Sequence, residues 1–414
     1  MSLHYKNKSL FLEDVDIEKL AEKVKTPVFI YSRKELLGNY SAIEKTLSKF
    51  NHVICFAVKS NSNLALLHEL AKRGCGADIV SGGELYRALK AGISPKKIVY
   101  SGVGKTEDEI SYALESKIKL FNIESLEELM SISRVAKRKK RIAPIAIRIN
   151  PDIEVDTHHH VKTGKAETKF GINFPHVLEA YVEATRLPNL NVIGVHMHIG
   201  SQIKEVNPYV KGIRKLMEIV NCLSIMGIQL KIIDIGGGFG IAYSEKEKLF
   251  PLEELSKEMA PLIKQNNLML IVEPGRFISG PSGILVTRVI YCKNVYPKNF
   301  IIVDAAMNDL VRPSLYDAYH AILPLKKLKR KNIVADVVGP VCETGDYIAK
   351  NRTMAACKAG EYIAVKDAGA YGFSMSSNYN SRTRAAEVMV SGSSYTVVRK
   401  RETYSNLIEG ERFI

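Results

Sequence analysis

The sequence has few cysteines, no long apolar run and no low-complexity segment. Its 6 cysteines, spread over 414 residues, form no C-x-x-C pair, which argues against a disulfide framework or a structural zinc site. No apolar stretch approaches the roughly 18 residues of a membrane-spanning helix. The apolar cluster near the N-terminus, Leu10 to Leu12, runs directly into Glu13 and Asp14. We therefore expect a cytoplasmic protein without a signal peptide or a membrane span.

The composition is that of a globular protein, with 46% hydrophobic and 25% charged residues. At about 150 residues per domain, the length suggests one large domain and one smaller domain. The 59 basic and 44 acidic residues leave a net charge of +15, which a polyanion partner could explain. The dense basic runs, Lys137 to Arg141 and Lys326 to Lys331, are short and lack interleaved aromatic residues. We therefore favour a solvated basic surface and expect no nucleic-acid partner.

An alternation of strand-like and helical segments begins near residue 52. Runs rich in β-branched residues predict eight strands, which are His52 to Lys59, Gly76 to Val80, Lys97 to Ser101, Leu120 to Ile123, Ile145 to Asn150, Asn191 to Ile199, Lys231 to Ile235 and Leu268 to Glu273. Three of the intervening helices begin with capping boxes, namely Ser81/Glu84, Thr106/Glu109 and Ser125/Glu128. Eight such units predict an α/β protein with a (β/α)8 TIM barrel. An open doubly wound sheet is the alternative, but the turn after the first strand lacks the usual G-x-G-x-x-G pattern.

A C-terminal all-β domain is expected after about residue 283. Strand-like runs separated by turns replace the helices there, at Ile284 to Tyr291, Phe300 to Asp304, Ile333 to Val338, Tyr362 to Lys366 and a hairpin from Glu387 to Arg399. Thr26 to Ser32 also predicts a strand, and because it precedes the barrel pattern we expect it to pair with the later sheet. The predicted division is an N-terminal segment of residues 1–32, a barrel of residues 33–283 and a β domain of residues 284–414.

The first predicted strand ends in a lysine. Alternation places Cys55, Ala57 and Lys59 on one face, and active sites in such barrels lie at the C-terminal ends of the strands. If that face points inward, burial would favour a neutral, nucleophilic amine on Lys59. A surface lysine with a solvated amine explains the same pattern equally well.

The sixth predicted strand carries Gly194, His196 and His198 on one face. The two imidazoles could form a metal pair, a platform for stacking on a ring, or satisfied core residues. A zinc barrel would need further His and Asp ligands at other strand ends, and these are missing, so we expect no metal. For His158 to His160, in the insertion after the fifth strand, a solvated or lid role is favoured over metal binding.

Glycine-rich turns follow the last two predicted strands. Asp234 to Gly240 reads D-I-G-G-G-F-G, and Glu273 to Arg276 reads E-P-G-R. Bare glycines let backbone N–H groups approach a phosphate, and such barrels commonly bind one after strands seven and eight. A lysine, a phosphate cradle and an acidic residue at one barrel mouth suit pyridoxal phosphate.

These motifs resemble those of the diaminopimelate decarboxylases, within the fold-type III alanine racemase and ornithine decarboxylase superfamily. The resemblance covers nearly the whole chain and rests on F-A-V-K-S-N (Phe56 to Asn61), C-G-A-D-I-V-S-G-G-E-L (Cys75 to Leu85), T-K-F-G-I (Thr168 to Ile172), H-M-H-I-G-S-Q-I (His196 to Ile203), the two glycine motifs above, R-P-S-L-Y (Arg312 to Tyr316), C-E-T-G-D (Cys342 to Asp346) and Tyr371. It implies a carboxy-lyase that uses pyridoxal 5'-phosphate and converts meso-diaminopimelate to L-lysine and CO2, the last step of lysine biosynthesis.

The resemblance also implies roles for residues of the cofactor site. Lys59 would form the Schiff base, His198 would stack on the cofactor ring, and Glu273 would keep the pyridine nitrogen protonated. The phosphate would be bound by Ser201, Gly238, Gly275, Arg276 and Tyr371.

Substrate residues follow from the same resemblance. Arg276, Arg312 and Tyr316, together with Tyr371, would bind the substrate, and two arginines suit a diacid. Cys342 and Glu343 match a pair that the family contributes from the second subunit of a homodimer. The Cys342 thiol would protonate Cα, and the Glu343 carboxylate would neutralise the distal ammonium group. A buried packing residue is the alternative for a lone cysteine. Thr344, where the family usually has serine, is a mild departure.

Two rival functions are open at this point. A decarboxylase of ornithine, arginine or a carboxylated polyamine has the same fold, but we would expect C-D-x-x-D in place of Cys342-Glu343. A non-catalytic carrier of pyridoxal phosphate resembles the barrel half, but such proteins normally lack the β domain that bears Arg312, Cys342 and Tyr371.

Overall fold

The computed structural model describes residues 2–153, 169–264 and 266–414. The chain divides into two compact units. The first unit comprises residues 40–241 and 248–277, and the second comprises residues 1–39, 242–247 and 278–414. Among the described residues, no helix is both long and apolar enough to cross a membrane.

The first unit is a closed barrel of parallel strands. Its strands are β5 (His52–Ala57), β6 (Gly76–Ile79), β7 (Ile98–Tyr100), β8 (Leu120–Ile123), β9 (Ala143–Asn150), β11 (Leu190–His196), β12 (Ile232–Asp234) and β13 (Met269–Val272). In the described part of the chain these eight strands pair in this order, and β13 pairs with β5, which closes the sheet. The short strand β10 (Ile172–Asn173) pairs with β9. The predicted TIM barrel is confirmed, and the open sheet is excluded.

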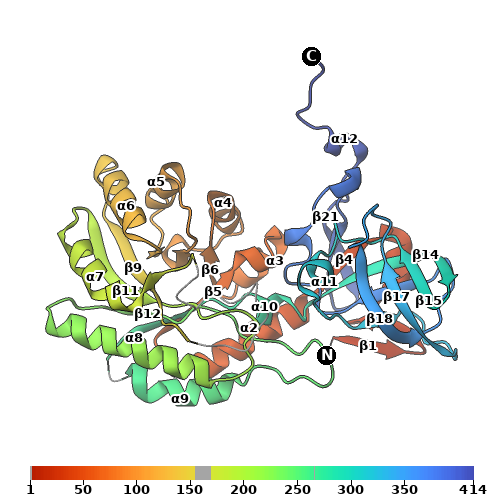
Figure 1. The fold of residues 1–414 in the computed structure, drawn as a ribbon, viewed down its shortest axis with the longest axis horizontal. Helices are drawn as coiled ribbons and strands as arrows, with labels where there is room; N and C mark the ends of the chain where they lie inside the picture. Colours follow the sequence, from red (N-terminus) through yellow and green to blue (C-terminus); the bar gives the residue numbers. More distant parts are fainter. Residues whose placement is uncertain (1, 154–168, 265) are drawn as a thin grey trace. The chain divides into compact units, whose positions relative to one another are not determined.

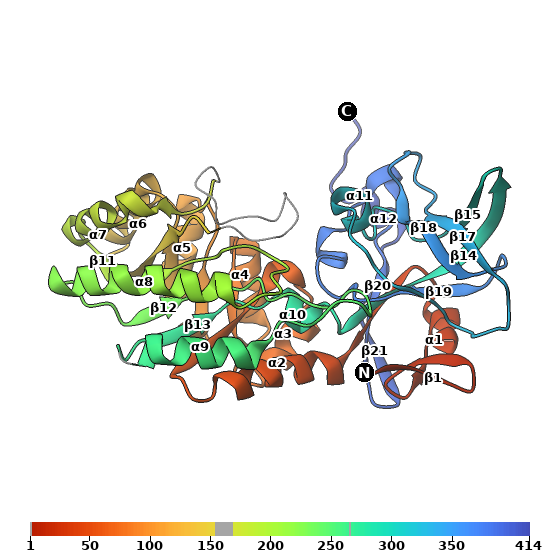
Figure 2. The same ribbon diagram turned by 60° about the horizontal axis from the view of Figure 1, so that its bottom comes forward.

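Helices alternate with the barrel strands. They are α2 (Arg33–Leu47), α3 (Leu64–Ala71), α4 (Gly82–Lys90), α5 (Glu107–Glu115), α6 (Leu126–Arg138), α7 (Val177–Arg186), α8 (Asn207–Ile225) and α9 (Leu252–Lys264). Figure 1 shows α5, α6 and α7 outside strands β9 and β11, and Figure 2 shows α8 and α9 beside β12 and β13. Buried apolar side chains from β5, β7, β8, β9, β12 and β13 form a shared core cluster.

One of the three predicted capping boxes is complete. Thr106 and Glu109 satisfy each other's backbone N–H groups at the start of α5. Ser81 and Ser125 also cap their helices. The carboxylates of Glu84 and Glu128, however, accept from the N–H one residue before the cap.

The second unit is built on a mixed β-sheet. Its strands are β1 (Leu3–Lys6), β2 (Ser9–Leu12), β3 (Val15–Asp16), β4 (Val28–Ser32), β14 (Gly283–Val295), β15 (Lys298–Val303), β16 (Ile322–Pro324), β17 (Asn332–Val338), β18 (Tyr347–Ala355), β19 (Tyr362–Val365), β20 (Ala386–Ser391) and β21 (Ser394–Arg399). The main sheet has the order β18-β17-β15-β14-β4-β20-β21, and β19 joins β14 to β16. Both views show β14, β15, β17 and β18 side by side (Figures 1 and 2). The short helices are α1 (Ile17–Val24), α11 (Arg312–Tyr316) and α12 (Tyr404–Leu407).

Strand β4 of the N-terminal segment belongs to this main sheet, whereas β1, β2 and β3 form a separate three-stranded sheet. Strand β4 pairs antiparallel with β14 and parallel with β20, which confirms the expectation for Thr26 to Ser32. Leu10, Ile17, Val28, Ile284 and Val388 share its buried core. The sequence patterns missed β1–β3, β16 and β18. In β18 three polar residues, from Lys350 to Arg352, interrupt the apolar alternation that identifies a strand.

Candidate active site

Lys59 lies just beyond the first barrel strand. Strand β5 ends at Ala57, and Lys59 is part of the following 3-10 turn, Val58–Ser60. The predicted strand was therefore too long, and alternation with Cys55 does not set the direction of the lysine. The side chain nevertheless remains at the C-terminal end of the barrel strands, where a TIM barrel places its chemistry.

The amine of Lys59 forms an ion pair with an aspartate of the next strand. Its Nζ lies 2.8 Å from Oδ2 of Asp78, whose side chain is fully buried. Burial, together with the nearby Glu273 carboxylate, raises the pKa of Asp78 to about 6 against the opposing charge of Lys59. Sequence analysis missed Asp78, although an aspartate within the otherwise apolar strand Gly76–Ile79 was an available signal.

Glu273 follows β13 and is 3% exposed. Its Oε1 accepts hydrogen bonds from Nδ2 of Asn122 at 3.2 Å and from Oγ of Ser101 at 3.4 Å. Its Oε2 lies 3.5 Å from Nε2 of His196. Burial alone would raise the pKa of Glu273, but His196 and Lys59 outweigh it and lower the pKa. The barrel interior therefore holds an ionised carboxylate.

Asp234 is a second buried carboxyl group beside Glu273. Burial, and next the charge of Glu273, raise the pKa of Asp234 well above its ordinary value. Of the two carboxyl groups, Asp234 is therefore the one that holds a proton more readily. Ligand atoms of His196, Asp234 and Glu273 lie within 4.8 Å of one another, a spacing that a metal ion could use. The contacts of Glu273 with Asn122 and His196 account for the same cluster as a hydrogen-bonded carboxylate network.

The two histidines of the H-M-H motif occupy different environments. Strand β11 ends at His196, which is 1% exposed, whereas His198 lies beyond the strand. Nδ1 of His198 accepts a hydrogen bond from the backbone N–H of Gly237 at 3.2 Å. Burial, and next the charges of Arg148 and Lys59, lower the pKa of His198 well below its ordinary value. His198 is therefore a neutral ring, and His196 belongs to the carboxylate cluster.

The turn after β12 has no room for side chains. A Cβ on Gly237 would overlap the carbonyl oxygen of Glu273, and a Cβ on Gly238 would overlap that of Gly200. Gly238 also has a φ of +95°, a left-handed conformation that favours glycine. The backbone of this turn is therefore held close to its neighbours, and its predicted role as a phosphate cradle stays a prediction.

Arg276 and Ser201 meet near the same strand ends. Arg276 begins the short helix α10 (Arg276–Ser279) and is 7% exposed. Its NH2 group donates a hydrogen bond to Oγ of Ser201 at 3.0 Å. A Cβ on Gly275, the residue before, would crowd the side chain of Ser60. The structure thus brings together, in the first unit, all the residues predicted there: Lys59, His198, Ser201, Gly238, Glu273, Gly275 and Arg276.

The remaining predicted residues lie in the second unit. Helix α11 begins with Arg312, which is buried, and ends with Tyr316. The two residues are four apart, so they occupy the same side of the helix. Tyr371 has a φ of +56°, a rare conformation for a tyrosine.

Cys342 and Glu343 lie on an exposed loop of the second unit. The backbone N–H of Cys342 donates to Oδ1 of Asn380 at 2.9 Å, and a hydrogen bond to Glu343 raises the pKa of Tyr379. Because Cys342 is exposed, the alternative of a buried packing residue is wrong. Sequence analysis did not anticipate that the segment around Asn380 holds this loop.

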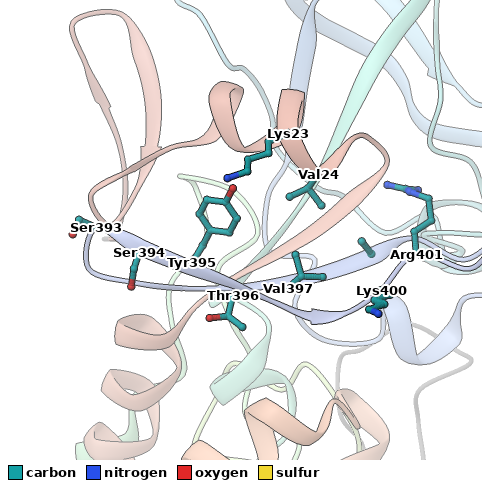
Figure 3. A pocket seen from close by; sticks show the side chains of 10 residues that line it. Lys23, Val24, Ser393, Ser394, Tyr395, Thr396, Val397, Lys400 and Arg401 are labelled. Atoms are coloured by element: carbon teal, nitrogen blue, oxygen red, sulfur yellow. The ribbon is translucent and has the colours of Figure 1, made fainter.

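His158 to His160, and Thr168 of the T-K-F-G-I motif, lie outside the described residues. A groove of about 760 Å³ in the second unit is lined by the end of α1 and by the β20–β21 hairpin, including Lys23, Tyr395 and Arg401 (Figure 3). It contains none of the predicted site residues.

The chain is similar in sequence to known proteins over nearly its whole length. Residues 33–280 match the family described as pyridoxal-dependent decarboxylase, pyridoxal binding domain. The chain is 45% identical over 407 residues to diaminopimelate decarboxylase of Aquifex aeolicus, covering 98% of this chain and 96% of that protein. It is 44% identical over 403 residues to the enzyme of Neisseria meningitidis serogroup B, covering 97% of each.

Solved structures agree with these matches. Diaminopimelate decarboxylase of Helicobacter pylori, complexed with L-lysine, has a TM-score of 0.92 at 40% identity, covering 95% of this chain and 98% of that one. The enzyme of M. jannaschii has a TM-score of 0.95 at 34% identity, covering 100% and 98%.

The barrel, the lysine and the buried carboxylate at its strand ends, and these matches define a pyridoxal-dependent decarboxylase. Within that class, the identity of 44–45% over nearly the whole chain identifies the particular family. The chain belongs to the diaminopimelate decarboxylase family, whose reaction is the final step of lysine biosynthesis.

Proposed function

We propose that this chain decarboxylates meso-diaminopimelate at its D-configured centre, releasing CO2 and L-lysine, with pyridoxal phosphate as cofactor. The observation that carries the proposal is the buried, ionised Glu273 in the same barrel as Lys59 and the glycine turn. Membership of the family indicates the substrate, and the barrel residues are suited to the cofactor chemistry that the reaction needs.

The barrel residues fit the cofactor. Lys59 offers an amine, Glu273 offers a negative charge for a pyridinium nitrogen, and the turn at Gly238 offers backbone without side chains. When bound, pyridoxal phosphate supplies an electron sink for the bond that breaks.

Each of these residues would then have a role of its own. Lys59 would hold the cofactor covalently, and Asp78 would fix the position of its amine. Glu273 would keep a proton on the pyridine nitrogen because its carboxylate stays ionised. The neutral ring of His198 would pack against the cofactor without adding a competing charge. The phosphate would be bound by Ser201, Gly238, Gly275 and Arg276, to which the family resemblance adds Tyr371.

The substrate-binding residues that we propose are those implied by the family resemblance. Arg276, Arg312 and Tyr316, with Tyr371, bind substrate carboxylates, because guanidinium groups form paired hydrogen bonds to them. Glu343 pairs with the distal ammonium group. The Cys342 thiol delivers a proton to Cα after CO2 has left.

We further propose a homodimer in which Cys342 and Glu343 complete the site of the partner subunit. Their exposure on a loop suits residues that reach another chain. The functional division is a cofactor-binding domain of residues 33–283, with residues 1–32 and 284–414 forming the β domain. Six unpaired cysteines suit a reducing cytoplasm.

The test is CO2 release from separate incubations with meso-diaminopimelate, L-ornithine and L-arginine. We expect release from meso-diaminopimelate only. L,L-diaminopimelate is the matched control, because it has the same carboxylates and amines but no D centre. Release from ornithine or arginine alone would overturn the substrate assignment, and equal release from the two diaminopimelates would overturn the choice of centre.

A further inference from the structure

A buried histidine holds the guanidinium group of Arg312. His320 lies between α11 and β16 and is fully buried. Its Nε2 lies 2.8 Å from NH1 of Arg312, and its Nδ1 lies 2.7 Å from the backbone carbonyl oxygen of Lys366. The ring of Tyr243 lies 4.9 Å from the guanidinium carbon and packs edge-on against His320. Two rings thus confine the Arg312 side chain.

The two hydrogen bonds determine the tautomer of His320. A carbonyl oxygen can only accept, so Nδ1 must carry the hydrogen toward Lys366. A guanidinium nitrogen can only donate, so Nε2 must offer its lone pair to Arg312. The backbone carbonyl of His320 also accepts from NH1 of Arg352 at 2.7 Å. His320 is therefore a neutral acceptor whose ring and backbone are both anchored.

An acidic residue near Arg312 could compete with a ligand for its guanidinium group. Asp367 follows Lys366, is 7% exposed, and interacts electrostatically with Arg312. An unrestrained guanidinium group could turn toward this internal carboxyl group instead of toward a ligand. The hydrogen bond to His320 uses one N–H of the planar guanidinium group. It thereby fixes the plane in which the remaining N–H groups of Arg312 lie.

We propose that His320 is a positioning residue for substrate recognition, which holds Arg312 in the orientation that binds the carboxylate retained in the product. The inference rests on the proposed function, in which Arg312 binds that carboxylate. His320 itself touches no reacting atom, and its effect passes through Arg312.

The test compares two ligands of the holoenzyme that differ by this one group. L-lysine carries the carboxylate, and cadaverine has the same chain and amines without it. We expect His320→Phe to weaken L-lysine binding about tenfold, the scale for loss of a hydrogen bond to a charged group. Cadaverine binding should stay within about twofold, because it does not use Arg312. Binding is followed by isothermal titration calorimetry.

Two conservative variants separate positioning from general structure. His320→Gln keeps an acceptor for Arg312, and His320→Asn keeps a donor for the Lys366 carbonyl. We expect glutamine, and not asparagine, to restore L-lysine binding. The reverse order, or an equal loss of both ligands in all three variants, would overturn the inference.

Arg312→Ala supplies the remaining control. It should lower the preference for L-lysine by itself, and adding His320→Phe should then cause no further loss. A further loss in this background would overturn the positioning role while leaving the carboxylate assignment intact. If Arg312→Ala leaves the preference unchanged, the assignment of Arg312 in the proposed function fails, and the role of His320 fails with it.

Discussion

The pKa values of two neighbouring buried carboxyl groups in the barrel are shifted in opposite directions. Burial and the charge of Glu273 raise the pKa of Asp234, while His196 and Lys59 lower the pKa of Glu273. An amide is therefore a close substitute for Asp234 and a poor one for Glu273.

Substitutions at these two sites test the difference. We expect Glu273→Gln to lower kcat at least about a hundredfold, because the charge facing the pyridine nitrogen is lost. Asp234→Asn should stay within about threefold, since a neutral group with the same shape replaces a neutral acid. Steady-state rates are compared at equal cofactor occupancy, read from visible absorbance. Similar losses in both variants would contradict the assigned protonation states.

Under the proposed function, cofactor attachment depends on Lys59. We expect Lys59→Ala to remove the visible absorbance band of the purified holoenzyme, because the amine beside Asp78 is gone. Lys72→Ala is the control, since Lys72 is an exposed residue paired with Glu69. A band that survives in the Lys59 variant would place the covalent link elsewhere.

At the scale of elements, the conformation of the turn after β12 requires glycines, because there is no room there for a side chain. Gly237→Ala should destabilise the protein by about 1–3 kcal/mol or more, because its Cβ overlaps the carbonyl oxygen of Glu273. Gly38→Ala is the matched control. Gly38 lies on the exposed side of α2, and an added Cβ there meets nothing within 4 Å, so alanine should stabilise the protein by about 0.5–1 kcal/mol.

Thermal unfolding of the two variants measures this contrast. The Gly237 variant should melt below the parent and lose cofactor affinity, and the Gly38 variant should melt above it. Equal melting temperatures for parent and Gly237→Ala would show that the turn relaxes around the new methyl group.

Strand ends were less predictable than strand centres. All eight barrel strands were predicted, yet β5 stops before Lys59 and β11 stops before His198. The alternation of apolar and polar residues indicates which side chains share a face of a strand. It does not indicate where the strand ends, because a strand ends where its pairing with the neighbouring strand stops. Lys59 and His198, which we propose take part in the chemistry, lie beyond that point.

For the whole molecule, the residues that we propose for the site are divided between two compact units. Under the proposed shared-site dimer, Lys59→Ala and Cys342→Ala should complement each other when unfolded and refolded together. A mixed dimer has one site with both defects and one with neither. Random pairing makes about half the dimers mixed, so activity should approach about one quarter of the parent. Separately refolded variants are the controls.

A lack of complementation between the two variants would contradict the shared site. If mass spectrometry demonstrates mixed dimers and activity does not rise above the separate controls, Lys59 and Cys342 act within one subunit. Cys342→Ala alone should still bind cofactor, because it leaves the barrel residues unchanged.

The sequence by itself determined the barrel, the β domain and the place of the N-terminal strand in that sheet, and its resemblance to a known family identified the site motifs. The barrel and the sheet depend on local periodicity, capping and turn residues, which are properties of neighbouring positions in the chain. Tertiary structure alone decided which groups are charged. The state of Glu273 depends on His196 and Lys59, and the tautomer of His320 depends on Arg312 and Lys366. Those partners come from separate elements, and burial strengthens their interactions by removing water, so no local pattern could reveal them.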